Sequence, residues 1–419
     1  MVERRKPIPV QEAIDKVMTL SYEGATEIIP LSECDGRHLS VDVRADHDVP
    51  PFDRSPYDGF AIRAEDTYKA GQDSPVTLEV IEEIGAGTVA TKFPQANQAI
   101  RIMTGAPIPE GTNAVIMLEL VQEFKEEAKD FIKIKRKITK GDNLSLQGED
   151  TKKGTNLIEK GSIVTPGVKA LLATFGYAQV PVAVKPEVGI FATGTELLDP
   201  EEALEPGKIR NSNSPMIEGQ VKDAGANPLY FGKLDDDFET CFSSVKKALE
   251  KVDFLITTGG VSVGDYDYLP AIYEKLGATV LFNKVGMRPG SVTTVAEWNG
   301  KLLFGLSGNP SACFVGFELF ARPILKRALF SQFPYRAKSM GTLLTDFPKP
   351  NPFTRFVRCR TEEREGRIFV KPTGLDKSGS VTSLAEANAF AVLPGGTRGF
   401  KAGDLVDLLH LRDAGSEYL

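Results

Sequence analysis

The sequence predicts a multidomain protein that combines a doubly wound α/β domain with a β-rich domain, a two-segment linking domain and a small C-terminal β-barrel domain. Three observations support this class. At 419 residues the chain is too long for one ordinary hydrophobic core. Strand and helix patterns alternate from Pro186 to about Phe330. Short strands broken by Gly and Pro turns fill the regions on either side.

The linking domain is expected at residues 1–48 and 141–182. The first segment holds an amphipathic helix, because five apolar residues between Val10 and Met18 recur at helical spacing. The second segment is rich in Gly, Lys and Asp before it turns apolar, and it would return the chain to the N-terminal helix.

The two β domains are expected at residues 49–140 and 333–419. In the first, the strand candidates read "VTLEVIEEIGAG", "AIRIMTG", "NAVIMLELV" and "FIKIKRKI". In the second they read "RFVRCRTEE", "RIFVKPTG", "FAVLPGG" and "DLVDLLHL". The spacing of this last set is typical of a small β-barrel.

The α/β domain is expected at residues 183–332. Its strand candidates are "EVGIFATG", "NPLYFG", "DFLITTGG" and "TVLFNKV", and helical stripes run between them. This alternation predicts a parallel sheet with right-handed crossovers. Ligands of such sheets bind beyond the carboxyl ends of the strands, where the glycine-rich loops of this chain also fall.

Composition excludes several classes of protein. Hydrophobic residues make up 41% and charged residues 26%, with 57 acidic against 50 basic side chains and a net charge of −7. We therefore expect a soluble protein without nucleic acid as its partner. The N-terminal sequence lacks a signal peptide and no apolar run of 18 residues follows, which predicts a cytoplasmic protein without membrane attachment.

Cysteine and histidine usage argues against zinc and disulfides. The four cysteines lie far apart with no CxxC spacing, and none of the three histidines has a Cys or His partner at ligand spacing. The cysteines are expected to be reduced core residues. The P-loop and the GxGxxG dinucleotide motif are also missing from the sequence.

The loop "ITTGGVSVGDYDYLP" follows a buried strand and precedes a helix. Gly259 and Gly260 permit positive φ, so their amides can face an anion, and Thr258 and Ser262 add hydroxyl donors. The carboxylates of Asp265 and Asp267 follow at once, and Mg²⁺ would reconcile them with a phosphate. A tight turn with a helix-capping aspartate remains an alternative.

Two further strand ends carry carboxylates. "FATGTELLDP" places Glu196 after the preceding strand, and Glu196 and Asp267 would share a metal ion if both strands lie near the switch point of the sheet. "KLDDDFET" places Asp235, Asp236 and Asp237 at a third strand end, as further candidate ligands. The alternative for at least one aspartate of that run is a helix N-cap.

Cations and a helix start follow in the same domain. "NKVGMRPGSVTT" places Lys284 and Arg288 around a Pro-Gly turn, where they would bind phosphate or another oxyanion unless they form a solvated surface. In "LSGNPSA", Asn309 is suited to cap a helix and Pro310 to begin it. Such a helix start attracts anions, although every helix has one.

The β-rich domain contains irregular polar loops. "PPFDRSPYDGFA" holds Asp58, "RIMTGAPIPEGT" holds Thr104, and "LQGEDTKKG" holds Glu149 and Asp150. Long polar loops in compact domains are functional more often than average. The alternative for the first is a rigid Pro turn with Asp58 and Gly59 at its corner.

In their order, these loops resemble the molybdopterin molybdenumtransferase family, which comprises MoeA and the E domain of gephyrin. The matching sequences are "PPFDRSPYDGFA", "RIMTGAPIPEGTNAVIM", "GED", "FATGTEL", "TTGGVSVGDYD", "MRPGS" and "LSGNPSA". They cover essentially the whole chain. The α/β domain would then be a MogA-like, molybdopterin-binding domain.

The resemblance implies that molybdate is inserted into the dithiolene of adenylyl-molybdopterin, with release of AMP and with Mg²⁺ as cofactor. It also implies a homodimer, and possible contact with other proteins of molybdenum cofactor biosynthesis. The residues implied as catalytic are Asp58, Thr104, Asp150, Glu196 and Asp267. Those implied to bind substrate are Thr258, Gly259, Gly260, Ser262, Lys284, Arg288, Asn309, Pro310 and Ser378, and those implied to bind metal are Glu196, Asp236 and Asp267.

The chain departs from the usual family pattern in several loops. Thr195 replaces a carboxylate in "TGDEL", Ser145 replaces an arginine before "GED", and "SPYDGFA" stands for "SAMDGYA". The usual Lys-Pro-Gly-Lys-Pro turn is Arg-Pro-Gly-Ser-Val here, so Ser291 replaces a lysine. We expect these departures to affect substrate contacts more than the type of reaction.

Two other functions compete with this one. The α/β domain alone resembles the enzyme that adenylylates molybdopterin, but that enzyme lacks the β-rich region. A scaffold that binds a partner protein, as the likeness to gephyrin permits, would have no need of carboxylate loops. The favoured mechanism is electrostatic, with carboxylates holding the metal ion and Lys284 and Arg288 holding oxyanion oxygens, and without a protein nucleophile.

Overall fold

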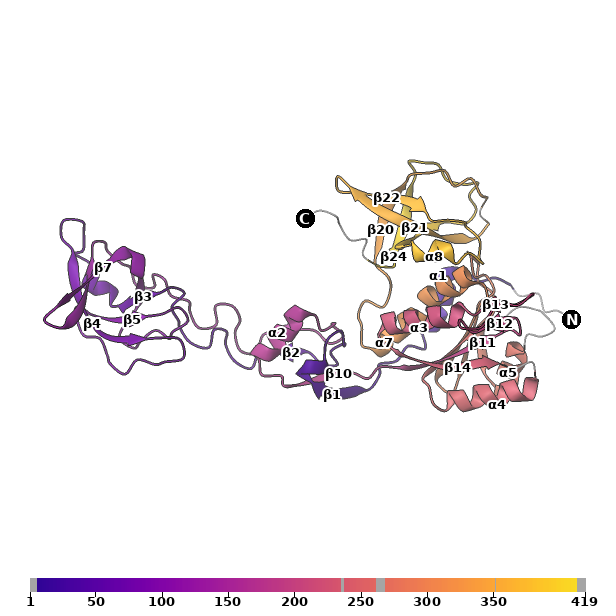
Figure 1. Cartoon of the computed structure of the whole chain (residues 1–419), viewed down its shortest axis with the longest axis horizontal. Helices are drawn as coiled ribbons and strands as arrows, with labels where there is room; N and C mark the ends of the chain where they lie inside the picture. Colours follow the sequence, from indigo (N-terminus) through magenta and orange to yellow (C-terminus); the bar gives the residue numbers. More distant parts are fainter. Residues whose placement is uncertain (1–5, 235–236, 261–267, 351, 413–419) are drawn as a thin grey trace. The chain divides into compact units, whose positions relative to one another are not determined.

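The computed structural model describes residues 6–234, 237–260, 268–350 and 352–412 (Figure 1). The chain forms two compact units, which we describe separately. The larger unit comprises Met1–Val41, Lys160–Lys169 and Ala178–Leu419, and the smaller unit comprises Asp42–Glu159 and Ala170–Tyr177. Within the described residues, no helix is both long enough and apolar enough to cross a membrane.

A six-stranded sheet forms the centre of the larger unit. Its strand order is β14-β11-β15-β19-β18-β16. The bounds are β11 Glu187–Thr193, β14 Asn227–Leu234, β15 Phe254–Thr258, β16 Thr279–Phe282, β18 Thr294–Trp298 and β19 Lys301–Leu306. Strands β14, β11, β15 and β19 pair in parallel, whereas β18 runs antiparallel to both of its neighbours. The four expected strands are confirmed, but the sequence reading missed the β18–β19 hairpin.

Helices cover both faces of this sheet, as the doubly wound class requires (Figure 1). Along β15, Phe254 and Ile256 pack on one face and Leu255 packs on the other, because side chains alternate along a strand. The first face is covered by α1 Val10–Met18, α3 Asn213–Ala224, α6 Pro310–Gly316, the π-helical turn η4 Phe317–Ala321 and α7 Arg322–Ala328. The second face is covered by α4 Phe238–Leu249 and α5 Leu269–Leu276.

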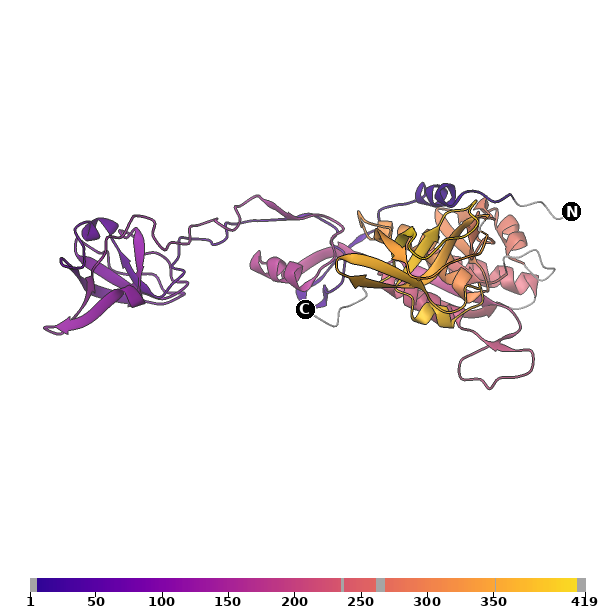
Figure 2. The ribbon, with the colours of Figure 1, turned by 90° about the horizontal axis from the view of Figure 1, so that it is seen from above.

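The C-terminal part of the larger unit is a closed five-stranded barrel, drawn in orange to yellow in Figures 1 and 2. The pairing runs β21-β22-β20-β24-β23 and returns from β23 to β21. The bounds are β20 Lys338–Leu343, β21 Thr354–Arg364, β22 Arg367–Pro372, β23 Ala389–Leu393 and β24 Leu405–His410, with α8 Thr382–Ala385 beside them. The barrel predicted from the sequence is confirmed. A short strand, β17 Met287–Arg288, pairs with β21 and joins the barrel to the α/β part.

Strands from distant parts of the chain meet in both units. In the larger unit β1 Thr26–Pro30 pairs with β10 Gln179–Ala183, which brings together the two segments of the expected linking domain. Helix α2 spans Pro166–Thr174 and the short turn η1 spans Leu31–Glu33. In the segment after β11, strands β12 Leu197–Leu198 and β13 Ile209–Arg210 pair with each other.

The smaller unit contains a six-stranded sheet of order β6-β3-β5-β4-β8-β7. Its strands are β3 Gly59–Ile62, β4 Val76–Ile84, β5 Gln98–Ile102, β6 Ala114–Met117, β7 Val121–Glu126 and β8 Lys129–Ile134, with short turns η2 Ala64–Thr67 and η3 Leu118–Leu120. Strands β2 Val43–Arg44 and β9 Asn156–Ile158 pair apart from this sheet. All four cysteines of the chain are free and buried, as the sequence predicts.

Candidate functional site

The loops after β11, β15 and β19 lie side by side at the carboxyl end of the central sheet. The strands end in register, since Ala192 pairs with Thr258 and Thr258 pairs with Leu306. The Thr193 hydroxyl donates to the Thr258 carbonyl at 3.2 Å. The Gly259 N–H donates to the Leu306 carbonyl at 2.8 Å. Three loops that are separate in the sequence therefore meet at the carboxyl edge of the sheet.

The glycines after β15 are required by their backbone and their surroundings. Gly259 and Gly260 have φ of 93° and 68°, a region that side chains rarely adopt. A Cβ on Gly259 would also lie 2.5 Å from the Thr193 hydroxyl. Beside them the Thr258 Oγ1 is buried and has no hydrogen-bond partner among the described residues.

Of the three predicted metal ligands Glu196, Asp236 and Asp267, the structure describes Glu196. Glu196 is exposed, and its carboxylate folds back over Gly194, whose φ is 130°. Asp236, Asp267 and Ser262 lie outside the described residues. Among the residues that are described, no three His, Cys, Asp or Glu side chains gather closely enough to hold a metal ion.

One aspartate of the acidic run caps a helix. The Asp237 carboxylate accepts from the N–H and the hydroxyl of Thr240, at 2.9 and 2.6 Å. These hydrogen bonds, of which that from the side chain is the stronger, lower the pKa of Asp237 below its ordinary value. The expected N-cap for this run is therefore confirmed at Asp237.

A cavity of about 410 Å³ lies where the α/β part meets the barrel. It brings together three predicted residues that are distant in sequence, namely Arg288, Asn309 and Ser378. Lys284 does not belong to its lining, and its carbonyl accepts from the Ile8 N–H at 3.1 Å. The full lining is Arg288–Val292, Ser307, Asn309, Ala312, Arg355, Arg358 and Asp376–Ser378.

The start of α6 is held by the barrel. Asn309 occupies the N-cap position and Pro310 begins the helix as expected, but the Asn309 side chain makes no capping hydrogen bond. Instead, the Ser311 N–H donates to the Ser378 carbonyl at 2.9 Å, and the Ser311 hydroxyl donates to the Ser380 carbonyl at 2.6 Å. The expected side-chain cap was wrong, because a loop of the barrel supplies acceptors for this helix end.

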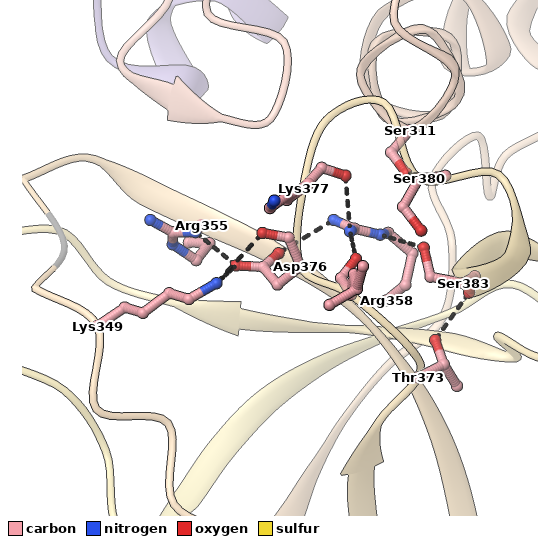
Figure 3. A network of polar contacts seen from close by, with 10 residues as sticks. Ser311, Lys349, Arg355, Arg358, Thr373, Asp376, Lys377, Ser380 and Ser383 are labelled. Carbon is pink, nitrogen blue, oxygen red and sulfur yellow. Dashed lines mark hydrogen bonds and ion pairs between the residues drawn. The ribbon is translucent and has the colours of Figure 1, made fainter.

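A charged network of four residues, three of which line the cavity, was not predicted from the sequence (Figure 3). The Asp376 carboxylate accepts from Arg355 at 2.5 Å, from Arg358 at 3.2 Å and from Lys349 at 3.4 Å. Arg358 is only 1% exposed, and burial lowers its pKa while Asp376 opposes that change. A signal was present, since "RFVRCR" places arginines between the apolar residues of a strand.

In the smaller unit the structure brings Asp58 and Thr104 together. One oxygen of the Asp58 carboxylate accepts from the Thr104 N–H at 2.7 Å and from its hydroxyl at 2.8 Å. These two hydrogen bonds, that of the backbone first, lower the pKa of Asp58. Asp150 lies in another loop, where its N–H donates to the Val49 carbonyl at 3.0 Å.

Gly59 does not form the corner of a turn. It begins β3, and a Cβ there would collide with the Ile116 carbonyl of the neighbouring strand. The glycine is needed for the close approach of β3 and β6.

Comparison with known proteins covers the whole chain. Residues 8–176 match the MoeA N-terminal region (domain I and II), residues 189–327 match a probable molybdopterin binding domain, and residues 340–411 match the MoeA C-terminal region (domain IV). The chain belongs to the MoeA family. The resemblance predicted from its loops is thereby confirmed.

Relatives within the MoeA family are similar over their full lengths. The molybdopterin molybdenumtransferase of Bacillus subtilis is 59% identical over 100% of this chain and 97% of that relative. The enzyme of the same name from Staphylococcus aureus is 48% identical over 98% and 97%. The crystal structure of a molybdopterin biosynthesis MoeA protein from Pyrococcus horikoshii OT3 is 34% identical, with a TM-score of 0.82, and covers 97% of this chain and 100% of that one. The chain is therefore an enzyme of molybdenum cofactor biosynthesis.

Proposed function

We propose that this member of the MoeA family inserts molybdate into the dithiolene of adenylyl-molybdopterin, with release of AMP and with Mg²⁺ as cofactor. The names of its relatives support the transfer of molybdenum to molybdopterin. The observation that carries the proposal is the cavity between the α/β part and the barrel. Four cations and one carboxylate line it, a balance suited to a doubly charged tetrahedral oxyanion.

The chemistry proposed for the cavity is binding and orientation. Arg288 reaches the cavity from the Pro-Gly turn, and Arg355 and Arg358 reach it from β21. Guanidinium groups hold tetrahedral oxyanions through paired hydrogen bonds, which fixes both the position and the orientation of the ion. Oriented cations also stabilise charge that develops on the oxygens during transfer.

The metal ion is assigned to the carboxyl end of the sheet. Glu196 is an exposed carboxylate three residues beyond the end of β11, and its hard oxygen donors suit Mg²⁺. Asp236 and Asp267 are the proposed additional ligands. When bound, the cation would neutralise phosphate charge. The Gly259 N–H already donates to the Leu306 carbonyl, so the Gly260 N–H and the Thr258 hydroxyl are the donors proposed for that phosphate.

The test is a defined reaction of purified protein, adenylyl-molybdopterin, molybdate and Mg²⁺, with AMP release and molybdenum in the product as readouts. We expect Glu196→Ala and Asp267→Ala each to lower the rate by at least about 100-fold, because charge stabilisation in active sites has this magnitude. Glu201→Ala is the matched control, since Glu201 is an exposed carboxylate only five residues from Glu196. Full activity in both carboxylate variants would exclude the proposed metal site.

The proposal also includes a cytoplasmic homodimer. It assigns Asp58, Thr104 and Asp150 of the smaller unit to the reaction. Sedimentation of the purified chain tests the dimer independently of activity.

A further inference from the structure

The carboxylate of Asp376 is already in contact with the cations of the cavity. Its two oxygens accept from Arg355, Arg358 and Lys349 (Figure 3). The side chain of Asp376 is 10% exposed, and those of Arg355 and Arg358 are 9% and 1% exposed. A carboxylate therefore occupies the position between two largely buried guanidinium groups, as an anionic ligand would.

The positive charge of the cavity exceeds what Asp376 neutralises. Arg288, Arg355, Arg358 and Lys377 line it together with this one carboxylate. In a partly buried site unit charges a few ångströms apart interact strongly, so the surplus favours a further anion. Asp376 reduces that surplus by one charge and also uses donors of both arginines that an oxyanion would need.

The shape of the loop does not depend on the carboxylate alone. Arg358 also donates to the carbonyls of Leu375 and Lys377, at 3.1 and 3.2 Å. The Ser311 N–H fixes the Ser378 carbonyl from the opposite side at 2.9 Å. Removing the charge of Asp376 without changing its shape therefore leaves these three hydrogen bonds to position the loop.

We propose that Asp376 is an internal counter-anion that competes with the substrate oxyanion for Arg355 and Arg358 and so sets the affinity of the cavity. In the free protein the carboxylate keeps the two guanidinium groups paired and oriented. A tetrahedral oxyanion takes over part of their donors, and the carboxylate regains them when the ion leaves. Asp376 is thus a positioning and affinity-determining residue, and this role rests on the proposed binding of an oxyanion in the cavity.

Calorimetric titration of the full-length protein with inorganic phosphate and, separately, with molybdate tests this role. We expect Asp376→Asn to bind both ions more tightly, by about tenfold or more, because one competing charge is removed. A merely structural role predicts the opposite, since a loosened loop would weaken binding. Glu363→Gln is the matched control, because Glu363 is an exposed carboxylate on β21, the strand that carries Arg355 and Arg358. Unchanged or weaker binding by a folded Asp376→Asn variant would overturn the proposal.

Thermal unfolding provides the second measurement. Without phosphate we expect Asp376→Asn to melt below the wild type, because two buried guanidinium groups lose their counter-ion. Saturating phosphate should raise the melting temperature of this variant more than that of the wild type, since only the native state binds the ion. A variant that stays unfolded in saturating phosphate also overturns the proposal, because an oxyanion then cannot replace the carboxylate.

These measurements are independent of molybdopterin. Tighter phosphate binding by Asp376→Asn, together with absence of molybdenum insertion by the wild type, would reject the proposed reaction and keep the role of Asp376. Molybdenum insertion by the wild type, together with unchanged ion binding by the variant, would reject the role of Asp376 and keep the reaction.

Discussion

At the scale of single residues, the carboxylates of this chain differ in what holds them. Asp58 accepts two hydrogen bonds from Thr104, Asp237 caps α4, and Asp376 faces three cations. The hydrogen bonds lower the pKa of Asp58 and of Asp237, whereas Asp376 is paired with cations. The sequence shows all three simply as aspartates in polar loops, so the partner decides which of them is available to a ligand.

The Asp58–Thr104 contact predicts a pH dependence. Its hydrogen bonds lower the pKa of Asp58, so the contact stabilises the fold above the pKa of an unfolded aspartate and loses this effect as the pH falls through the folded value. We expect Thr104→Val to raise the pKa of Asp58 toward its ordinary value, although the backbone N–H of residue 104 still donates. The stability difference between wild type and variant should shrink on acidification.

Carboxyl NMR titration and melting curves at several pH values measure these two effects. Thr112→Val is the control, because the Thr112 hydroxyl donates to the Pro109 carbonyl in the same loop and not to Asp58. Identical Asp58 titrations in the wild type and in Thr104→Val would show that the hydroxyl contributes nothing.

At the scale of elements, the helical stretch from α6 to α7 makes polar contacts with the barrel and with the segment that leads into it. Ser311 at the start of α6 holds the loop that contains Ser378. Further along, the π-helical turn η4 presents Glu318, whose side chain is 2% exposed, to Arg336 at 2.8 Å in the segment before β20. Gln220 of α3 donates to the other Glu318 oxygen at 2.7 Å. The cavity depends on both sets of contacts, because its lining comes from the α/β part and from the barrel.

We expect Arg336→Leu to destabilise the α/β domain by on the order of 3 kcal/mol, because a buried carboxylate loses its closest cation. The double variant Glu318→Leu with Arg336→Leu should be less destabilised, since no charge is then left unpaired. The fluorescence of Trp298, the single tryptophan of the chain, reports unfolding of the sheet that contains it.

The control is Arg364→Leu, which removes an ion pair to Glu362 whose two side chains are 58% and 55% exposed. An exposed pair contributes only about 0–1 kcal/mol, so this variant should melt near the wild type. Equal losses of stability in Arg336→Leu and Arg364→Leu would contradict a stabilising role of the buried Glu318–Arg336 ion pair.

At the scale of the whole molecule, a domain of the predicted molybdopterin-binding type occurs here in one chain with a β-rich unit and a barrel. The cavity includes residues from the barrel as well as from the α/β part. An α/β domain alone would lack Arg355, Arg358 and Asp376. This organisation favours metal transfer over adenylylation of molybdopterin.

Purified protein mixed with molybdopterin and ATP should therefore produce no adenylylated molybdopterin, as followed by chromatography of the product. The positive control is the same preparation with adenylyl-molybdopterin and molybdate, in which AMP should appear. Adenylylated product formed at a rate comparable to AMP release would favour the alternative enzyme class.

Local patterns in the sequence predicted most of the elements. The stripe from Val10 to Met18, the strand and helix rhythm after Pro186 and the Pro at the start of α6 each depend on neighbouring residues, and each element is present in the structure. The β18–β19 hairpin was not predicted, because the pattern of alternating strands and helices left "TVAEW" and "KLLFGL" unassigned as a strand pair.

The sequence by itself determined the classes of its domains, the family and the separate loops that carry chemistry, because periodicity, turn residues and motifs are local properties. Only the tertiary structure decided which loops meet. It placed Arg288, Asn309 and Ser378 around one cavity, left Lys284 out of it, and supplied Arg355, Arg358 and Asp376 from the barrel. The physical reason is that charge and hydrogen bonding act over a few ångströms in space, whereas these residues are separated by tens of positions along the chain.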